Sequence, residues 1–254
     1  MIRVVILGFG NVGWHLATAF HAAEGVELLQ IYNRSEIDKP DFLSPVKFTT
    51  SIDSLQEADV YILAMPDDSI REFSAKFSED NKFIVHTSGS VPLAELSAFN
   101  RRGVFYPLQT FSKGNPVNFS EIPVCIEAEN REDQELLTNL GECISQTVRV
   151  INSEARASIH LAAVFVNNFS NHMYRIAMEF LKEKELDFSL LKPLIYETAK
   201  KIATLSPADA QTGPAKRNDL KTIEKHLNLL GNSDHRELYS QLTRAIQTTY
   251  GKKL

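Results

Sequence analysis

The sequence contains few cysteines, since Cys125 and Cys143 are the two among 254 residues. Their separation is not that of a paired metal ligand or of a redox-active pair, and we therefore expect no metal site. Cys125 falls in a predicted strand and Cys143 in a predicted helix. We expect both to be buried, reduced thiols of a cytoplasmic protein.

Long hydrophobic runs, basic leaders, repeats and low-complexity segments are also missing. A surplus of positive charge is absent too, because 27 Lys and Arg face 32 Asp and Glu, for a net charge of -5. These absences argue against a membrane protein and against a general nucleic-acid partner. The hydrophobic content of 43% and charged content of 23% are ordinary for a soluble globular protein with a small-molecule ligand.

Glycine is sparse, with 11 residues, yet three glycines form the most informative motif. A buried-strand pattern at residues 4–7 leads directly into a G-x-G-x-x-G turn that opens an apolar-periodic helix. The turn comprises Gly8, Phe9, Gly10, Asn11, Val12 and Gly13. A second strand at residues 26–32 completes a βαβ unit, so the pattern predicts a dinucleotide site with the pyrophosphate at the helix N-terminus. The alternative is a glycine-rich turn without a ligand.

The residues after the second strand indicate which dinucleotide is bound. NAD sites usually place Asp or Glu there to hold the ribose 2′-hydroxyl, whereas this chain has Asn33, Arg34 and Ser35. Arg34 can stack on adenine or pair with a 2′-phosphate, and Asn33 and Ser35 can donate hydrogen bonds to the same phosphate. The sequence therefore favours NADP(H). The alternative is an ordinary solvated surface arginine.

Further predicted strands at residues 60–64, 83–86 and 103–106 end in polar or proline-containing turns. The carboxyl ends of parallel strands line the ligand crevice, so we expect Ala64, Met65 and Pro66 to border the cofactor. A capping box at residues 69–72 is expected to start the next helix, and a further helix is expected over 92–99. A strand-helix-strand segment over 122–150 closes the predicted sheet.

From Ser153 onward the periodicity is that of helices, expected near residues 154–184, 190–205, 219–230 and 235–249. We therefore predict an α/β protein: a Rossmann, doubly wound, mostly parallel sheet over residues 1–151, followed by an all-helical domain over 152–254. The helical domain is expected to serve substrate binding and dimerisation, with the substrate pocket at the seam.

The first long helix carries a polar stripe on a helix that we expect to be otherwise apolar. On a 3.6-residue period, His160, Asn167, Asn171 and Arg175 share one face. One interpretation is a satisfied hydrogen-bond network between helices. The other is a catalytic face, with His160 and Asn167 as catalytic residues, since imidazole titrates near working pH and can act as a general acid. Asn171 is then assigned to substrate binding.

Two turns are further candidates. Ser88 follows the predicted strand at 83–86 and could supply or relay a proton beside the cofactor, or could merely cap turn amides. The turn over residues 212–219 could bind a carboxylate or phosphate through exposed amides and basic side chains, or could be a plain helix cap. Thr212, Gly213 and Arg217 are the substrate-binding candidates in that turn.

Several motifs together resemble an uncharacterised bacterial family in which a Rossmann-like domain precedes a helical domain of unknown function. They are the segments 63–68, 86–90, 106–111, 160–172 and 212–219. The whole chain also resembles pyrroline-5-carboxylate reductase, prephenate dehydrogenase and the 6-phosphogluconate dehydrogenase superfamily. The resemblance implies an NADP-dependent oxidoreductase that pairs its helical domains in a homodimer, and we add Gln109 of the third segment to the substrate-binding candidates.

Two departures from these relatives are informative. The β-hydroxyacid dehydrogenase pattern has Lys and, four residues later, Asn on the first long helix, whereas here Asn167 precedes Asn171. The glycine-containing substrate loop of pyrroline-5-carboxylate reductase is not reproduced at residues 206–209. We therefore expect neither a lysine-based mechanism nor proline synthesis. The leading hypothesis is hydride transfer to or from a small anionic substrate, and the alternative is a non-catalytic NADP(H)-binding sensor.

Overall fold

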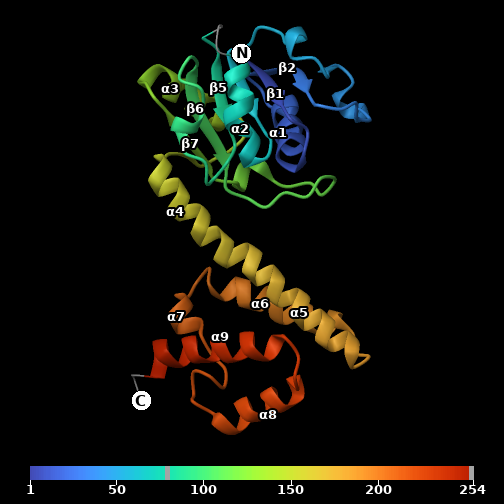
Figure 1. The fold of residues 1–254 in the computed structure, drawn as a ribbon, viewed down its shortest axis with the longest axis vertical. Helices are drawn as coiled ribbons and strands as arrows, with labels where there is room; N and C mark the ends of the chain where they lie inside the picture. Colours follow the sequence, from blue (N-terminus) through green and yellow to red (C-terminus); the bar gives the residue numbers. More distant parts are fainter. Residues whose placement is uncertain (78–80, 252–254) are drawn as a thin grey trace. The chain divides into compact units, whose positions relative to one another are not determined.

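The computed structural model describes residues 1–77 and 81–251, and a single eight-stranded sheet organises the N-terminal part (Figure 1). The strands in chain order are β1 (Ile2–Leu7), β2 (Val26–Tyr32), β3 (Lys47–Thr49), β4 (Val60–Leu63), β5 (Phe83–His86), β6 (Arg101–Pro107), β7 (Val124–Ala128) and β8 (Val148–Val150). Their order across the sheet is β3-β2-β1-β4-β5-β6-β7-β8. All neighbouring strands run parallel except β6 and β7, which are antiparallel. The predicted Rossmann-like, mostly parallel fold is confirmed.

Helices follow or separate these strands and then continue alone to the C-terminus. They are α1 (Asn11–Ala22), α2 (Asp67–Ser74), α3 (Arg131–Glu142), α4 (Ser153–Ala163), a π-helical segment (Val164–Phe169), α5 (Ser170–Glu183), α6 (Lys192–Lys201), α7 (Pro207–Ala210), α8 (Leu220–Leu230) and α9 (His235–Tyr250). Short 3-10 turns lie between them, including Ala75–Phe77 after α2 and Leu93–Glu95 after β5. The expected helical C-terminal region is confirmed.

The chain forms two compact units, Met1–Asn168 and Phe169–Leu254. The first unit extends past the last strand because α4 packs on the sheet-bearing part through its buried Arg156. The division into domains at residue 151 stays a prediction: strands do end at Val150, while the compact units divide after Asn168.

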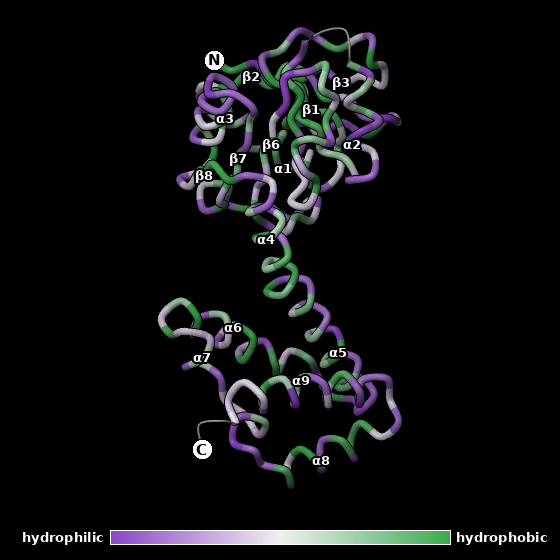
Figure 2. Tube along the Cα trace, turned by 60° about the vertical axis from the view of Figure 1, so that its left-hand side comes forward, coloured by the Kyte–Doolittle hydropathy of each residue, from purple (hydrophilic) through white to green (hydrophobic). Residues whose placement is uncertain are grey.

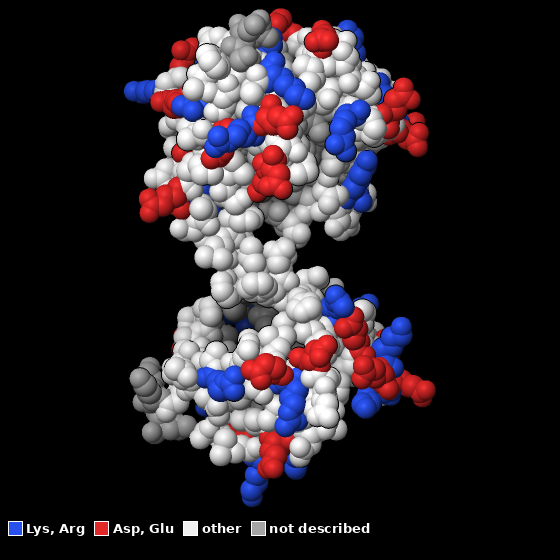
Figure 3. Space-filling view, in the orientation of Figure 1, with Lys and Arg blue, Asp and Glu red and all other residues white. Residues whose placement is uncertain are grey.

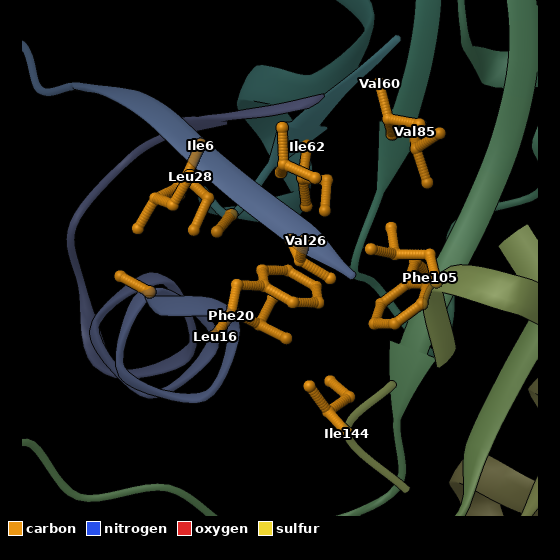
Figure 4. Close-up of a cluster of buried hydrophobic side chains, with 14 of the residues drawn as sticks. Ile6, Leu16, Phe20, Val26, Leu28, Val60, Ile62, Val85, Phe105 and Ile144 are labelled. Carbon is orange, nitrogen blue, oxygen red and sulfur yellow. The ribbon is translucent and has the colours of Figure 1, made fainter. Parts of the chain in front are cut away.

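Both faces of the sheet are covered, which explains the continuous apolar runs in its strands. On one face, Leu16 and Phe20 of α1 pack against side chains such as Ile6 and Phe105 (Figure 4). Leu137 of α3 belongs to the same cluster. On the other face, α2 and the 3-10 turn after it cover a second cluster. Figure 2 shows hydrophobic residues gathered along the strands of this unit. The result is a rigid base whose strand ends hold the candidate site.

Three local expectations are wrong. The capping box at residues 69–72 does not start α2, because the helix begins at Asp67, where Pro66 fixes the preceding backbone and supplies no side-chain cap. The helix expected over 92–99 is only the short 3-10 turn after Pro92. Cys143 is half-buried at the end of α3 rather than buried, although Cys125 in β7 is buried.

Among the described residues, no helix has both the length and the apolar character needed to cross a membrane.

Candidate functional site

The glycine turn lies between β1 and α1, and its three glycines have different surroundings. Gly8 adopts a φ of 110°, and a Cβ there would lie 2.4 Å from the Ala64 carbonyl oxygen. A Cβ on Gly13 would lie 2.0 Å from the Gly8 carbonyl oxygen, whereas one on Gly10 would meet no atom of the described residues within 4 Å. Gly8 and Gly13 are therefore needed for packing, and the space above Gly10 is open for a ligand.

A pocket of about 460 Å³ opens beside this turn, at the carboxyl ends of β1, β2 and β4. Its lining residues are Gly8, Phe9, Gly10, Tyr32, Asn33, Arg34, Ala64, Met65, Pro66, Ser69, Glu72, Phe73 and Lys76. The predicted cofactor-binding residues Ala64, Met65 and Pro66 are thus brought together with the glycines. Arg34 and Lys76 give the pocket two cations, and the Phe73 ring, 5.5 Å from Tyr32, gives it an aromatic wall.

Asn33 fastens the end of β2 to the glycine turn. Its side-chain oxygen accepts the Phe9 N–H at 3.2 Å, and its Nδ2 donates to the Ser35 carbonyl oxygen at 2.8 Å. These bonds use the groups that we expected to face a 2′-phosphate, so Asn33 shapes the loop that presents Arg34. Ser35 lines a neighbouring pocket of about 380 Å³ with Asn33.

A second cluster, Tyr106, His160 and Gly89, lies at the carboxyl ends of β5 and β6. The Tyr106 hydroxyl lies 3.1 Å from Nδ1 of His160, which α4 contributes. Gly89 packs against both rings, because a Cβ there would lie 2.6 Å from Nδ1 of His160 and 2.8 Å from the Tyr106 ring. Burial raises the pKa of Tyr106, and the electrostatic interaction with the neighbouring Cys125 raises it further. The phenol therefore stays protonated at neutral pH.

Because that phenol is protonated, its O–H can donate to Nδ1 of a neutral His160. The imidazole then carries its own hydrogen on Nε2. A protonated His160 ring can instead donate its Nδ1–H to the Tyr106 oxygen and release its Nε2 proton to a developing anion, returning to neutral imidazole.

Ser88 is committed to its own turn. Its Oγ accepts the N–H groups of Ser90 and Val91, each at 3.1 Å. The Ser90 hydroxyl donates to Asp67 at 2.5 Å, which leaves the Ser90 oxygen as the acceptor for the Ser88 proton at 3.3 Å. The geometry matches the turn-capping interpretation, and the catalytic role of Ser88 stays a prediction.

The start of α4 is anchored by buried charge. Arg156, which is fully buried, forms an ion pair with Glu127 of β7 and donates to the Val91 carbonyl oxygen. Glu127 also accepts the Ser153 hydroxyl at 2.8 Å. Because His160 lies one helical turn after Arg156, this anchor fixes where the imidazole stands relative to Tyr106.

The polar stripe does not have the form that the sequence predicted. The segment Val164–Phe169 is π-helical, so the 3.6-residue repeat that aligned His160 with Asn167 does not hold between them. The helix is also not buried, since Arg156 is the buried residue of α4. Asn167 is half-buried in the first unit, whereas Asn171 is exposed in the second unit.

The other predicted substrate-binding residues lie in turns. Gln109 is exposed just after β6, where its side-chain oxygen accepts the Thr110 N–H at 2.8 Å. The turn over 212–219 lies in the second unit, and the carboxylate of Asp219 already caps α8 by accepting the Thr222 N–H at 3.1 Å. Because the Asp219 carboxylate occupies the N-terminus of α8, this helix end does not offer free amides to an anion. The roles proposed for Thr212, Gly213 and Arg217 stay predictions.

Two residues of the site were missed at the sequence level. Tyr106 lies in an apolar strand pattern, where a tyrosine is expected to be a core residue. Its place near the strand end was nevertheless a usable signal of a site residue. Lys76 follows α2 by two residues, and nothing in its sequence context distinguishes it from a solvated surface lysine. No group of three or more His, Cys, Asp or Glu that could hold a metal ion occurs within residues 1–77 and 81–251.

The strand order 3-2-1-4-5-6, the glycine turn and the pocket beside it define the class of the first unit as Rossmann-like. A family model described as a domain of unknown function, DUF2520, matches residues 122–246. This match begins just before β7, inside the sheet. No curated protein matches the chain.

The chain is similar over nearly its whole length to a Bacteroides fragilis protein named "putative NADP oxidoreductase", with 38% identity and a TM-score of 0.90. The alignment covers 97% of this chain and 98% of that one. The chain therefore belongs to the same family as this protein, and its C-terminal half carries the DUF2520 domain. The predicted relationship to an uncharacterised family with a Rossmann-like and a helical part is confirmed.

More distant structures share the fold. Protein TM1727 of Thermotoga maritima is 21% identical, with a TM-score of 0.74 and coverage of 98% of this chain and 99% of that one. A pyrroline-5-carboxylate reductase of Coxiella burnetii is 15% identical, with a TM-score of 0.54 and coverage of 99% and 98%. At these identities the likeness concerns the fold.

Proposed function

We propose that the protein is an NADP(H)-dependent oxidoreductase that transfers a hydride to or from a small anionic substrate. The observation that carries the proposal is the pocket in which the glycine turn, Arg34 and Lys76 meet. The open space above Gly10 suits a pyrophosphate at the N-terminus of α1. The name of the Bacteroides fragilis relative supports the same cofactor. The cytoplasmic location stays a prediction.

The preference for the phosphorylated dinucleotide rests on charge. Arg34 and Lys76 line the pocket with a single carboxylate, Glu72, among its residues, and no acidic residue stands directly after β2 to repel a phosphate. Phe73 and Pro66 offer an apolar wall for adenine. The residues present therefore fit the adenosine 2′-phosphate of NADP(H) better than the 2′-hydroxyl of NAD(H).

The proposed chemistry needs a proton donor next to the hydride. Bound NADPH supplies the hydride, and reduction of a carbonyl or imine leaves an oxygen or nitrogen that must gain a proton. We assign this proton to Nε2 of the imidazolium form of His160, whose Nδ1–H donates to the Tyr106 oxygen; after the transfer the ring is left as neutral imidazole. The glycine turn follows β1, and Tyr106 is the residue before the last of β6. Because β1, β4, β5 and β6 run parallel, both lie at the same edge of the sheet, where an extended dinucleotide would reach.

The second candidate is a non-catalytic NADP(H)-binding sensor. It is favoured by the missing lysine on the first long helix and by the commitment of Ser88 to its own turn. A sensor would bind NADPH with the same residues. It would not oxidise NADPH with a substrate, so Tyr106 and His160 would have no catalytic role. Turnover by the wild-type protein therefore separates the two candidates.

The test is calorimetric titration of the purified protein with NADPH and with NADH, alongside the variants Arg34→Ala and Lys76→Ala. We expect a clear preference for NADPH that either substitution reduces by about tenfold, because each removes a charge-assisted hydrogen bond to phosphate. The matched control is Arg131→Ala, which removes a 90% exposed arginine side chain on α3, remote from the pocket-lining residues.

If neither nucleotide binds to the wild-type protein, the glycine turn is purely structural and the oxidoreductase proposal fails. If both nucleotides bind equally, hydride transfer stays the proposed chemistry, but the assignment of Arg34 and Lys76 to the 2′-phosphate is wrong. A preference for NADPH justifies screening keto and imino acids for oxidation of NADPH.

A further inference from the structure

We propose that Lys113, in the loop that follows β6, is a pyrophosphate-binding residue of the dinucleotide site. This inference rests on the proposed function and extends it from the adenosine end of the cofactor to its centre. The loop runs over residues 108–118 and returns beside α1 (Figure 1). Its first residues belong to the segment 106–111, of which the proposed chemistry uses Tyr106.

The loop is fastened to the start of α1 by two hydrogen bonds. The Lys113 N–H donates to the side-chain oxygen of Asn11 at 3.1 Å, and Asn11 is the first residue of α1 and part of the glycine turn. Nε2 of the buried His15 lies 3.1 Å from the Ser112 carbonyl oxygen. The backbone of Lys113 is therefore held against the helix end that receives the pyrophosphate.

Aromatic packing supports the base of the loop. The Phe111 ring lies 4.9 Å from the ring of His15 and stacks on Phe119 at 5.8 Å between centroids. Beyond Lys113 the chain turns at Gly114, whose φ is 83°. The loop thus has a packed base and a turn at its tip, with Lys113 between them.

The ammonium group of Lys113 is close to the glycine turn. Its Nζ lies 4.9 Å from the centroid of the Phe9 ring, and Phe9 lines the pocket. The Lys113 side chain is exposed, so this cation–π contact is weak and can be exchanged for a stronger bond to phosphate. A four-carbon stem allows the ammonium to move to a phosphate while the backbone stays fixed.

The helix end itself leaves room for such a cation. The first turn of α1 contains no acidic residue, and its N-cap is Gly10, which has no side chain to satisfy the amides. A pyrophosphate bound there carries two negative charges, of which the helix dipole balances only part. Lys113 places a cationic side chain against the Phe9 ring of this turn, in addition to Arg34, which lines the pocket with Gly8 and Gly10.

The experiment measures the dissociation constants of NADPH, NADH and adenosine 2′-monophosphate for the wild-type protein and for Lys113→Met. We expect about tenfold weaker binding of both dinucleotides in the variant, by the same factor, because both contain the pyrophosphate. Binding of adenosine 2′-monophosphate, which lacks the pyrophosphate, should be unchanged. Arg131→Gln is the charge-matched control, and it should leave all three constants unchanged.

Unchanged dinucleotide binding by Lys113→Met would overturn the inference while leaving the proposed function intact. A parallel loss of adenosine 2′-monophosphate binding would also overturn it, since the substitution would then act on the structure of the whole site. If the wild-type protein binds neither dinucleotide, the proposed function fails and the inference fails with it. A smaller salt dependence of NADPH binding in the variant is a further expected result.

Discussion

At the scale of single residues, the hydrogen bond between Tyr106 and His160 makes two side chains act as one unit. Tyr106→Phe removes the hydroxyl that holds the imidazole, and His160→Asn removes the proton donor. We expect His160→Asn to lower kcat by about 100- to 10,000-fold, the contribution typical of a positioned acid or base, and Tyr106→Phe to lower it by a smaller factor. Because the two residues act together, the double variant should be little slower than His160→Asn alone.

The measurement is NADPH oxidation with the keto or imino acid that the screen identifies, combined with NADPH titration. The dissociation constant of NADPH should stay within about twofold of the wild-type value in all three variants, because neither side chain lines the cofactor pocket. Additive losses in the double variant would show that the two side chains act independently and would contradict the assignment.

His86 gives the first unit a dependence on pH that is separate from catalysis. Burial, and then the charge of Arg156, lowers the pKa of His86 to about 3, from an ordinary value of 6.5. Above pH 6.5 the residue is neutral in both the folded and the unfolded states. Between pH 6.5 and about 3 the unfolded state takes up a proton that the folded state does not, so the free energy of unfolding falls as the pH falls.

This loss should reach as much as about 5 kcal/mol near pH 3 and should already be visible between pH 6 and 4.5. Urea unfolding over this range, compared with His86→Asn, is the measurement. The amide oxygen of Asn can replace Nδ1 as the acceptor for the Ser88 N–H, so the variant should fold and show a flatter pH dependence. Parallel curves for the two proteins would rule out His86 as the source.

Some residue roles could be predicted from the sequence and others could not. Gly8 and Gly13 could, because a Cβ on either would overlap a backbone oxygen, whereas the close approach of a cofactor to Gly10 stays a prediction. Asn33 was recognised as part of the site, but its bond to the Phe9 N–H depends on a turn whose shape the sequence does not specify. The place of Tyr106 near a strand end was a usable signal, but its pairing with His160, 54 positions away in the chain, could not be predicted from the sequence.

At the scale of elements, the attachment of α4 depends on one buried ion pair. Arg156→Met leaves Glu127 in its mostly buried position without its cation, and we expect a loss of about 3–5 kcal/mol in the free energy of unfolding. Chemical denaturation of the purified variant is the measurement. The control is Arg175→Met, which breaks an exposed pair with Glu179 and should cost less than about 0.5 kcal/mol.

A double variant, Arg156→Met with Glu127→Gln, sharpens this test. It removes the unpaired charge as well as the pair, so it should recover part of the stability that Arg156→Met loses. Equal stability of the two variants would mean that the packing of the long arginine side chain, and not its charge, anchors α4.

Elements with strong periodicity were predictable, whereas their ends and irregularities were not. The buried strands are continuous apolar runs because helices cover both faces of the sheet. The π-helical segment after α4 escaped prediction, since its six apolar or amide side chains fit a regular α-helix equally well. The start of α2 was misplaced because Pro66 could begin the helix two residues before the expected cap.

At the scale of the whole molecule, the apolar surface of the helical segments remains to be explained. Leu161 and Val166 of the first unit are 60% and 74% exposed, and Leu194 and Tyr196 of the second unit are 63% and 73% exposed. Charged side chains of both signs are spread over the first unit, while the middle of α4 is uncharged in Figure 3. Apolar surface of this extent on the helices of each unit marks an interaction site, and we propose that a second copy of the chain covers these helices.

Sedimentation at micromolar concentration tests this proposal. The wild-type protein should sediment at about twice its chain mass of 28.6 kDa. Val166→Glu should shift it toward the monomer, because a carboxylate would be desolvated in the interface without a partner. Phe99→Glu is the matched control, since Phe99 is 72% exposed in the first unit outside the helices, and it should leave the dimer intact. A monomeric wild-type protein, or equal effects of the two substitutions, would contradict pairing through these helices.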